Sequence, residues 1–297
     1  MQEVLGQDGQ DSEFSRRLPA NTAVLGEESM NRYGGYDNFP FAAESYDYNP
    51  IYSSRADVDF YLDLARSAEG KILELGCGTG RILIPTAAAG CEVVGLDLSE
   101  RMLARCREKL RKQPKEVRER VRLVRGNMAS FDLKEVFALI TTPFRSFQHL
   151  LSVQDQLSCL RCANRHLEKG GRLVLDVFQV NPRMTYEPKF MLEAEDVPEI
   201  ELPDGRKVRR CGRIVAYHRP EQCNDIELIH YVKHPDGREE RLVQAFPIRY
   251  FFRYEVEHLL ARCGFEVQEL FGNYDKSPLT NDSPEMVFLA EKCQNMR

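Results

Sequence analysis

The chain has 297 residues, which is enough for one large α/β domain or two smaller ones. Its formal net charge of −5 gives it no electrostatic attraction for nucleic acid or an anionic membrane, so we expect neither as a partner. No apolar run approaches the ~20 residues of a membrane-spanning helix, and the first residues do not resemble a secretory signal. The nine cysteines lack framework spacing, which favours reduced thiols and a cytoplasmic location.

The beginning of the chain has no regular hydrophobic pattern. Residues 1–45 are rich in Gln, Glu, Asn, Ser and Gly, and we interpret them as a flexible N-terminal arm. Val58, Tyr61, Leu62 and Ala65 then follow at helical spacing and predict a first helix.

From residue 71 onward the sequence alternates between strand-like and helix-like segments. Helices are predicted over 80–89 and 99–112, and around Leu157, Leu160 and Leu167, where Gly170-Gly171 ends the helix. A last helix runs from Val256 to its stop at Gly264. Strands are predicted over 71–76, 91–97, 121–126, 137–142, 172–178, 265–271 and 285–291. This alternation predicts an α/β, Rossmann-like fold with a mostly parallel seven-stranded sheet and helices on both faces.

Residues 205–251 interrupt this alternation with three β-rich runs, over 206–219, 225–234 and 240–252. The turn signal Pro235-Asp236-Gly237 separates the second run from the third. We interpret the runs as an inserted antiparallel β meander. The predicted domains are therefore 46–182 together with 253–297 for the α/β domain, and 183–252 for an inserted substrate-binding or cap region.

The strongest functional signal is a glycine-rich turn after the first predicted strand, Glu74-Leu75-Gly76-Cys77-Gly78-Thr79-Gly80-Arg81. Glycines let a backbone turn sharply and approach a ligand closely. The spacing differs from the Gly-x-Gly-x-x-Gly of dinucleotide-binding folds, because Arg81 occupies the position of the last glycine. Asp97 ends the next strand, where a carboxylate can accept hydrogen bonds from both hydroxyls of a ribose.

This block closely resembles the S-adenosylmethionine (SAM) binding signature of class I methyltransferases. The resemblance implies that Asp97 binds the ribose, that Leu98 packs on the adenine, and that the glycine turn surrounds the methionine part. The residues of that turn assigned to the cofactor are Glu74, Gly76, Cys77, Gly78 and Gly80. An ordinary strand–helix turn with a capping carboxylate is the alternative.

Gly126-Asn127-Met128 follows the third strand, where the family often has Gly-Asp-Met. The resemblance implies that Asn127 and Met128 contact the adenine, and an amide oxygen can accept from its amino group. The alternative for Asn127 is a role in shaping the turn.

The loop after the fourth strand should face the transferred methyl group, because ligands of open α/β sheets lie outside the carboxyl ends of the strands. DNA and glutamine methyltransferases often carry Asn-Pro-Pro-Tyr here, whereas this chain has Thr142-Pro143-Phe144. The difference argues against an amino-purine or amide nitrogen as acceptor. Residues 143–150 with 155–157 resemble small-molecule methyltransferases, including glycine and amino-sugar N-methyltransferases, which share a late antiparallel insertion.

Several residues around this loop are candidates for contacts with the reactants. His149 is the candidate catalytic base, with a helix cap or a backbone hydrogen bond as the alternative. Tyr46, Tyr48 and Tyr52 precede the first helix, where the family folds a lid over the cofactor; loosely anchored surface aromatics are the alternative. Pro143 and Tyr52 are assigned to the cofactor. The residues assigned to the substrate are Tyr46, Phe144, Arg145, Arg213, Arg249 and Tyr254.

Residues 206–219 carry six arginines and lysines without an acid between Gly205 and Arg219. They either bind an anionic substrate or form a solvated strand face, and the solvated face is favoured. Alternation places Arg209 and Arg213 on one face and Arg210 on the other. Cys159 and Cys162 resemble half a metal site but lie within a helix without a second pair, so no metal is expected.

The sequence therefore predicts methyl transfer from SAM to a nitrogen or oxygen of a small-molecule acceptor, leaving S-adenosylhomocysteine. A homodimer is one assembly that the sequence allows. The alternatives are a non-catalytic SAM-binding or scaffold protein, and an NAD-dependent oxidoreductase, which Arg81 and Glu74 disfavour. Nucleic-acid methylation is a third alternative, disfavoured by the charge.

Overall fold

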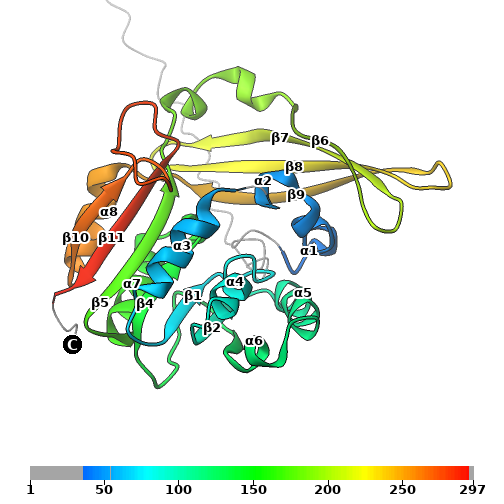
Figure 1. Cartoon of the computed structure of the whole chain (residues 1–297). Helices are drawn as coiled ribbons and strands as arrows, with labels where there is room; N and C mark the ends of the chain where they lie inside the picture. Colours follow the sequence, from blue (N-terminus) through cyan, green and yellow to red (C-terminus); the bar gives the residue numbers. More distant parts are fainter. Residues whose placement is uncertain (1–35, 54, 294–297) are drawn as a thin grey trace, which may run out of the picture.

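A computed structural model of the chain describes residues 36–53 and 55–293. It contains a seven-stranded sheet of order β10-β11-β5-β4-β1-β2-β3 and a separate four-stranded sheet of order β6-β7-β8-β9. Figure 1 shows the smaller sheet lying across the ends of the strands of the larger one. No helix in the described part of the chain is long and apolar enough to cross a membrane.

The larger sheet confirms the predicted Rossmann-like architecture. Its strands β1 to β5 pair in parallel, and β11 is antiparallel to both β5 and β10. The strands are β1 Ile72–Leu75, β2 Val93–Asp97, β3 Val121–Arg125, β4 Phe137–Thr142, β5 Leu167–Phe178, β10 Phe265–Phe271 and β11 Glu285–Lys292.

Helices cover both faces of this sheet because its strands are apolar on both sides. Leu73 and Leu75 belong to the core beneath α7 and α8, whereas Ile72 and Val93 belong to the core beneath α3, α4, α5 and α6. The helices are α3 Asp57–Arg66, α4 Leu83–Ala88, α5 Glu100–Arg111, α6 Lys115–Glu119, α7 Val153–His166 and α8 Arg253–Arg262.

The predicted end of the helix before β5 was wrong. Helix α7 ends at His166, and strand β5 already begins at Leu167. The register between β4 and β5 jumps from Phe137↔Leu167 to Leu139↔Arg172, so Gly170 and Gly171 lie in an irregular part of the strand. Gly170 has a φ of +74° there, which suits a bulge. The two glycines that were predicted to end the helix therefore lie within strand β5.

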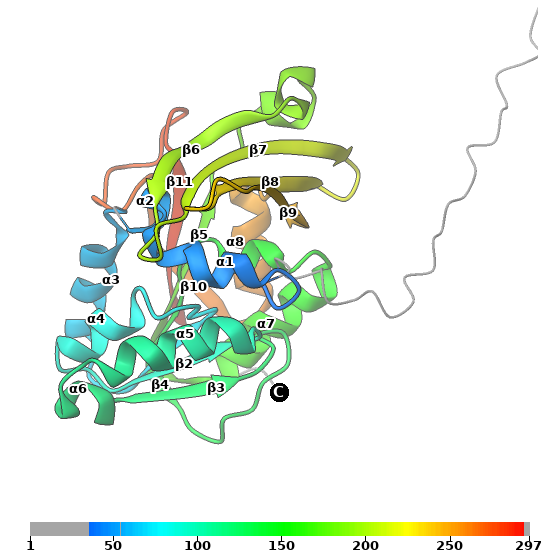
Figure 2. The same ribbon diagram turned by 90° about the vertical axis from the view of Figure 1, so that its right-hand side faces the viewer.

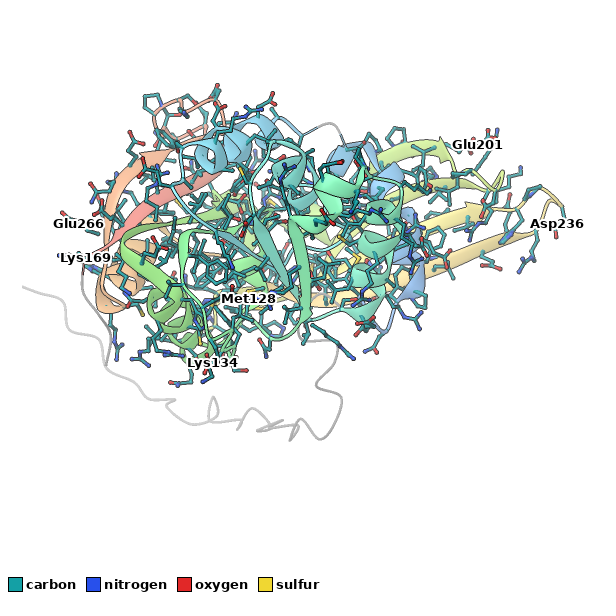
Figure 3. The ribbon with its side chains drawn as sticks, turned by 60° about the horizontal axis from the view of Figure 1, so that its bottom comes forward. Met128, Lys134, Lys169, Glu201, Asp236 and Glu266 are labelled. Atoms are coloured by element: carbon teal, nitrogen blue, oxygen red, sulfur yellow. The ribbon has the colours of Figure 1, made fainter. Side chains whose placement is uncertain are left out.

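The smaller sheet has one strand more than the three predicted runs. Its strands are β6 Ala194–Glu201, β7 Lys207–His218, β8 Cys223–Lys233 and β9 Glu239–Arg249. Strand β6 escaped the prediction because it is acidic, contains Pro198 and buries only Val197. An edge strand tolerates such a sequence, since its outer backbone groups need no partner. The β8–β9 hairpin projects from the body of the molecule, with Asp236 at its tip (Figure 3).

Residues 36–53, which precede α3, form short helical elements. These are α1 Pro40–Ser45, the short 3₁₀ turn η2 Tyr46–Tyr48 and α2 Pro50–Ser53. Phe41 is buried in a small core with Val208 and Val232 of the four-stranded sheet. Figures 1 and 2 show α1 between that sheet and α5. Residues 36–45 are therefore packed in the structure, whereas composition indicated a flexible arm over 1–45. Residues 1–35 of that predicted arm lie outside the described part.

Candidate active site

A pocket lies at the carboxyl ends of β1, β2, β3 and β4, where strand order reverses between β1 and β4. In open α/β sheets such reversal points are the usual ligand sites. The four-stranded sheet and the segment 36–53 form its remaining walls. Its lining residues are Tyr36, Tyr46, Tyr52, Gly76, Gly78, Leu96, Asp97, Leu98, Met102, Gly126, Asn127, Met128, Pro143, Phe144, Arg145, Ser146, His149, Ile226, Leu228, Phe246 and Ile248.

The three glycines of the turn after β1 serve different purposes. All three have left-handed backbone, with φ of +72° at Gly76, +53° at Gly78 and +79° at Gly80. A Cβ at Gly76 would lie 2.5 Å from Ser146 Oγ, and one at Gly80 would lie 2.6 Å from Cys106 Sγ. A Cβ at Gly78 would meet only Met102 Cε, at 3.3 Å, and Gly78 lines the pocket. Gly76 and Gly80 therefore permit close packing of the protein, while Gly78 exposes backbone to a ligand.

Asp97 at the end of β2 is fixed by the glycine turn itself. Its carboxylate accepts hydrogen bonds from Gly78 N at 2.7 Å and from Ser99 N at 2.8 Å. Burial raises the pKa of Asp97 to about 6, so the group is ionised at neutral pH. Each carboxylate oxygen retains further acceptor capacity, which suits a pair of ribose hydroxyls.

The loop after β3 contributes Asn127 and Met128 to the same pocket. Asn127 Oδ1 accepts from Ala129 N at 2.8 Å, which is the turn-shaping role considered as the alternative. An amide oxygen has two lone pairs, so this bond leaves it able to accept from an adenine amino group as well. Leu98 is 40% exposed and also lines the pocket, as a side chain that packs on a ligand would be.

Aromatic side chains of the segment 36–53 close one side of the pocket. The rings of Tyr46 and Tyr52 stack with centroids 4.3 Å apart, and Tyr52 meets the edge of Phe144 at 5.2 Å. The guanidinium of Arg210 in β7 donates to Tyr52 Oη at 2.5 Å. Asp47 accepts from Thr79 Oγ1, at 2.7 Å, in the glycine turn. The segment is thus attached both to the four-stranded sheet and to the turn after β1.

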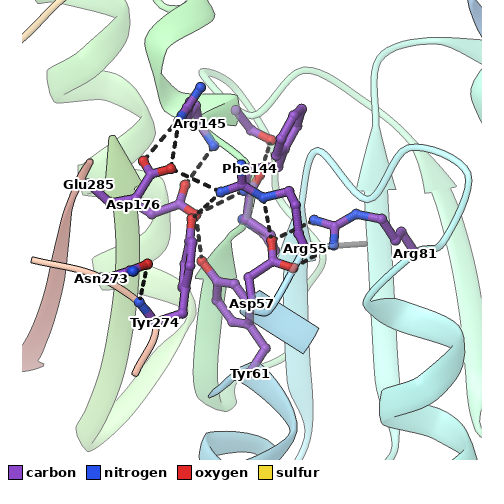
Figure 4. A network of polar contacts seen from close by, with 12 residues as sticks. Arg55, Asp57, Tyr61, Arg81, Phe144, Arg145, Asp176, Asn273, Tyr274 and Glu285 are labelled. Atoms are coloured by element: carbon purple, nitrogen blue, oxygen red, sulfur yellow. Dashed lines mark hydrogen bonds and ion pairs between the residues drawn. The ribbon is translucent and has the colours of Figure 1, made fainter. Parts of the chain in front are cut away.

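The loop after β4 has an unusual backbone held by a buried carboxylate (Figure 4). Phe144 and Arg145 have φ of +56° and +64°, a left-handed conformation that costs roughly 1–2 kcal/mol per residue. Asp176 in β5 accepts hydrogen bonds from both backbone N–H groups, at 3.0 and 2.6 Å. The hydroxyls of Tyr61 and Tyr274 donate to the same carboxylate. Four donors from three parts of the chain therefore hold Phe144 in place.

A second layer of charges surrounds the ring of Phe144. Arg81 makes two hydrogen bonds to Asp57, at 2.6 and 2.7 Å. Arg55 bridges Asp57 and Glu285, and both of these carboxylates are buried. The guanidinium carbons of Arg55 and Arg81 lie 4.7 and 5.5 Å from the Phe144 ring centroid. A cation that lies over the face of an aromatic ring is attracted to that ring. Arg81, which distinguishes the turn from a dinucleotide site, thus supports the wall of the pocket.

His149 ends the short 3₁₀ turn η3 Ser146–His149 and lines the pocket. Its Nδ1 is buried and has no hydrogen-bond partner among the described residues. The ring lies against Phe246, with centroids 5.6 Å apart, and against Tyr36, at 6.4 Å. Burial lowers its pKa to about 4, so the imidazole is neutral at pH 7. The helix-cap alternative was wrong, because Ser152 Oγ caps α7.

Some predicted cofactor residues lie behind the pocket rather than on its wall. Glu74 is 3% exposed, and its burial raises its pKa to about 8. Cys77 is buried and packs against β2. Gly80 faces Cys106, as described above. These three residues support the turn without lining the pocket.

Some predicted substrate residues are used in ion pairs elsewhere. Arg249 pairs with Glu255 at 2.7 Å and Arg213 with Glu227 at 2.7 Å, and neither arginine lines the pocket. Tyr254 on α8 is 65% exposed. None of these three residues lines the pocket, and their ion pairs or their exposure account for their positions without a substrate.

Several residues that line the pocket were not predicted from the sequence. They include Tyr36, Met102, Ser146 and an apolar set from β8 and β9, namely Ile226, Leu228, Phe246 and Ile248. The apolar set gave no clear alternation in the sequence, since Ile229 follows Leu228 directly and Phe246 lies between Ala245 and Pro247.

Most of the pocket residues described above belong to a domain that is shared with known proteins. Residues 72–171 match the family model described as a methyltransferase domain, which includes the glycine turn, Asp97, Asn127 and the loop after β4. The chain carries a methyltransferase domain that uses SAM as its methyl donor. The alternative of an NAD-dependent oxidoreductase is therefore excluded.

Related proteins span most of this methyltransferase. The cypemycin N-terminal methyltransferase of a Streptomyces species is 26% identical over 253 residues, which cover 84% of this chain and 96% of that protein. The structure of the CcbJ methyltransferase from Streptomyces caelestis is 25% identical, covers 88% of this chain and 99% of that chain, and superposes with a TM-score of 0.68. SAM-bound CalS10, an amino pentose methyltransferase from Micromonospora echinaspora, has 25% identity, coverage of 79% and 89%, and a TM-score of 0.61.

The residues of the pocket fit SAM. Gly78 offers a backbone surface that a side chain would obstruct, and the buried carboxylate of Asp97 lies beside it. The methyltransferase would hold the ribose with Asp97, the adenine with Leu98 and Asn127, and the sulfonium end near Tyr46, Tyr52 and Phe144. When bound, the cofactor supplies an electrophilic methyl group.

Gly78→Val should abolish or strongly weaken SAM binding. The branched side chain would project where the backbone approaches the ligand, and a loss of at least about tenfold in affinity is expected. Gly90→Val is the matched control, since Gly90 has a φ of +100° and nothing within 4 Å of its Cβ position. It introduces similar backbone strain away from the pocket and should leave SAM affinity unchanged in calorimetry. Equal affinities for both variants would show that the turn is not the cofactor cradle.

SAM affinity should fall as the medium is acidified through about pH 6. The raised pKa of Asp97 means that its carboxylate is ionised above about 6 and protonated below, when it loses acceptor capacity. We expect about a tenfold loss between pH 7.5 and pH 5. Asp97→Asn should bind SAM about tenfold more weakly at pH 7.5, because a charge-assisted hydrogen bond is lost, and should show little pH dependence. A wild-type affinity that stays flat over this interval would contradict the ribose assignment.

Asp176→Asn should impair both folding and turnover. Replacing one carboxylate oxygen by an NH₂ group leaves a buried N–H donor facing another donor, which costs roughly 1–3 kcal/mol in the free energy of unfolding. The turn at Phe144 and Arg145 should then relax, so kcat should fall by about tenfold or more while the SAM dissociation constant changes less.

Tyr274→Phe is the matched control for Asp176→Asn. It removes one of the four donors to the carboxylate but keeps the turn, and should cost about 1 kcal/mol with kcat near that of the wild type. A stable Asp176→Asn variant with normal kcat would show that the carboxylate does not hold the turn.

Proposed function

We propose that the protein transfers a methyl group from SAM to the nitrogen of a small-molecule amine. The observation that carries this proposal is the extent of the pocket, which continues from the glycine turn past Phe144 to His149 and the wall formed by β8 and β9. A cofactor bound by Asp97 and Gly78 would occupy one end only, and the rest is available to an acceptor.

Two further observations favour a small amine. The segment 36–53 covers the pocket, so a large nucleic acid would not reach its interior without displacing stacked tyrosines. Among the relatives, the cypemycin enzyme is named as an N-terminal methyltransferase and CalS10 as an amino pentose methyltransferase, so both are described as acting on amines or amine-bearing molecules. Nitrogen is therefore favoured over oxygen as the acceptor atom.

The described residues suit an in-line displacement on a neutral amine. The acceptor nitrogen forms a bond to the methyl carbon while the carbon–sulfur bond breaks, and the nitrogen takes up the positive charge that the sulfur loses. Release of one proton from the nitrogen to solvent then completes the reaction. Tyr46, Tyr52 and Phe144 present aromatic faces to the cationic region, and the fixed turn at Phe144 orients the reactants.

We assign His149 the role of a neutral hydrogen-bond acceptor for the amine N–H. A neutral imidazole accepts at one nitrogen, and such a bond would point the nitrogen lone pair toward the methyl group. The lowered pKa makes His149 a weak base, so it orients the acceptor rather than removing its proton.

The function is tested by incubating the protein with methyl-labelled SAM and fractionated metabolite extracts, followed by mass spectrometry. We expect labelled amines that carry one added methyl group and that do not form with Gly78→Val. Labelled ethers or esters alone would overturn the nitrogen assignment. SAM binding without any labelled product would instead favour a non-catalytic SAM-binding protein.

His149→Ala should lower kcat/KM for the acceptor by about tenfold or more with little change in SAM affinity. Because the pKa of His149 is about 4, the imidazole stays neutral from pH 9 down to about pH 5. The ratio of wild-type to variant activity should therefore be constant from pH 6 to pH 9, and should fall only in stronger acid as the wild-type imidazole is protonated.

His149→Asn is the control, since its amide oxygen can still accept a hydrogen bond and should restore part of the activity. A wild-type to variant ratio that changes markedly around pH 6.5 would indicate a general base of ordinary pKa and contradict the positioning role. Unchanged kinetics with a lowered melting temperature would remove His149 from the site.

A further inference from the structure

The wall of the pocket opposite the larger sheet is an apolar surface from two adjacent strands. Ile226 of β8 pairs directly with Phe246 of β9, and the alternation of side chains places Leu228 and Ile248 on the same face. All four residues line the pocket, and the Phe246 ring also contacts His149. We call these four residues the apolar wall.

The acceptor end of the pocket offers no unpaired charge among the residues described. Of the lining residues, only Asp97 and Arg145 carry a formal charge, and Asp97 lies at the cofactor end. Arg145 is paired with Glu285, at 2.6 Å, and lies over the ring of Phe178. Arg210, which donates to Tyr52, is paired with Asp196 at 2.8 Å. An anionic group entering this end would lose its water without gaining a free cation.

The arginine-rich run of β7 does not supply the missing positive charge. Arg213 pairs with Glu227, and Arg209 lies over the ring of Tyr231, 4.3 Å from its centroid. Neither side chain lines the pocket. For these two residues the structure agrees with the solvated strand face that the sequence favoured, and it adds the ion pair of Arg213.

We propose that the methyl acceptor is an amine on an apolar body that carries no phosphate, and that this body packs against the apolar wall. The inference rests on the proposed function and narrows its substrate class. Hydrocarbon surface that leaves water for this wall favours binding, whereas a phosphate or diphosphate would be desolvated there without compensation. The wall also favours the uncharged form of the amine, which is its nucleophilic form.

The proposal is tested by calorimetric binding of acceptor probes to the enzyme saturated with S-adenosylhomocysteine. The probes are a series of primary n-alkylamines from butyl to octyl, and a nucleoside-diphosphate-linked amino sugar. We expect affinity to rise about threefold to fourfold with each methylene, as burial of hydrocarbon predicts. We expect no saturable binding of the nucleotide-linked sugar.

Variants locate the binding on the apolar wall. Leu228→Lys places a cation there and should weaken octylamine binding by at least tenfold, with SAM affinity within twofold of the wild type as proof of folding. Leu228→Met keeps the wall apolar and should bind octylamine nearly as the wild type does. Val215→Lys adds the same charge at a position of the same sheet that is 42% exposed and outside the pocket, and should have no effect.

Tighter binding of the nucleotide-linked sugar than of octylamine, or no dependence on chain length, would overturn the proposal. Transfer assays on the same probes separate this failure from failure of the proposed function. Methylation of the nucleotide-linked sugar alone would keep the amine methyltransferase function and reject the apolar acceptor. Chain-length-dependent binding without methylation of any amine would keep the apolar site and reject the function.

Discussion

The geometry of the site depends on one buried carboxylate. Asp176 accepts the backbone N–H groups of Phe144 and Arg145 and so stabilises a turn that neither residue favours on its own. Tyr61 comes from α3 and Tyr274 from the loop between β10 and β11. The carboxylate on β5 is therefore hydrogen-bonded to a helix on one face of the sheet and to the antiparallel side of the sheet. The position of the Phe144 ring against the pocket follows from these bonds, as does the direction of the chain toward His149.

Charge pairs extend this arrangement to the cover of the pocket. Arg81 fixes the start of α3 through Asp57, and the segment 36–53 is attached to the glycine turn through Asp47 and to β7 through the bond between Arg210 and Tyr52. The pocket is therefore enclosed by parts of the chain that are far apart in sequence. The end of the pocket at Gly78 and Asp97 is polar because backbone and a carboxylate face it. The end at β8 and β9 is apolar because two antiparallel strands present one face to it.

The sequence was sufficient to predict the parts of the site that are local. Gly78 and Asp97 were predicted to share a site, and the structure places both in one pocket, because a strand, a glycine turn and the acid ending the next strand are a short-range pattern. Asp176 was missed, since a single acid in a buried strand does not reveal which backbone it will meet. Arg213 and Arg249 were predicted to bind the substrate, but they lie outside the pocket in ion pairs. The sequence did not reveal these pairs, because Glu227 and Glu255 become their neighbours only through strand pairing and through helix α8. Strand β6 was missed because edge strands need little hydrophobic pattern.

We propose that the turn held by Asp176 faces the methyl group of bound SAM, and nuclear Overhauser spectroscopy can measure this proximity. The protein would carry labelled phenylalanine, tyrosine and histidine rings and be saturated with SAM that is ¹³C-labelled at its methyl group. We predict cross-peaks from this methyl group to the rings of Phe144 and of Tyr46 or Tyr52, which weaken in the Asp176→Asn variant. A methyl group that contacts none of these rings in the saturated wild-type complex would contradict the claim.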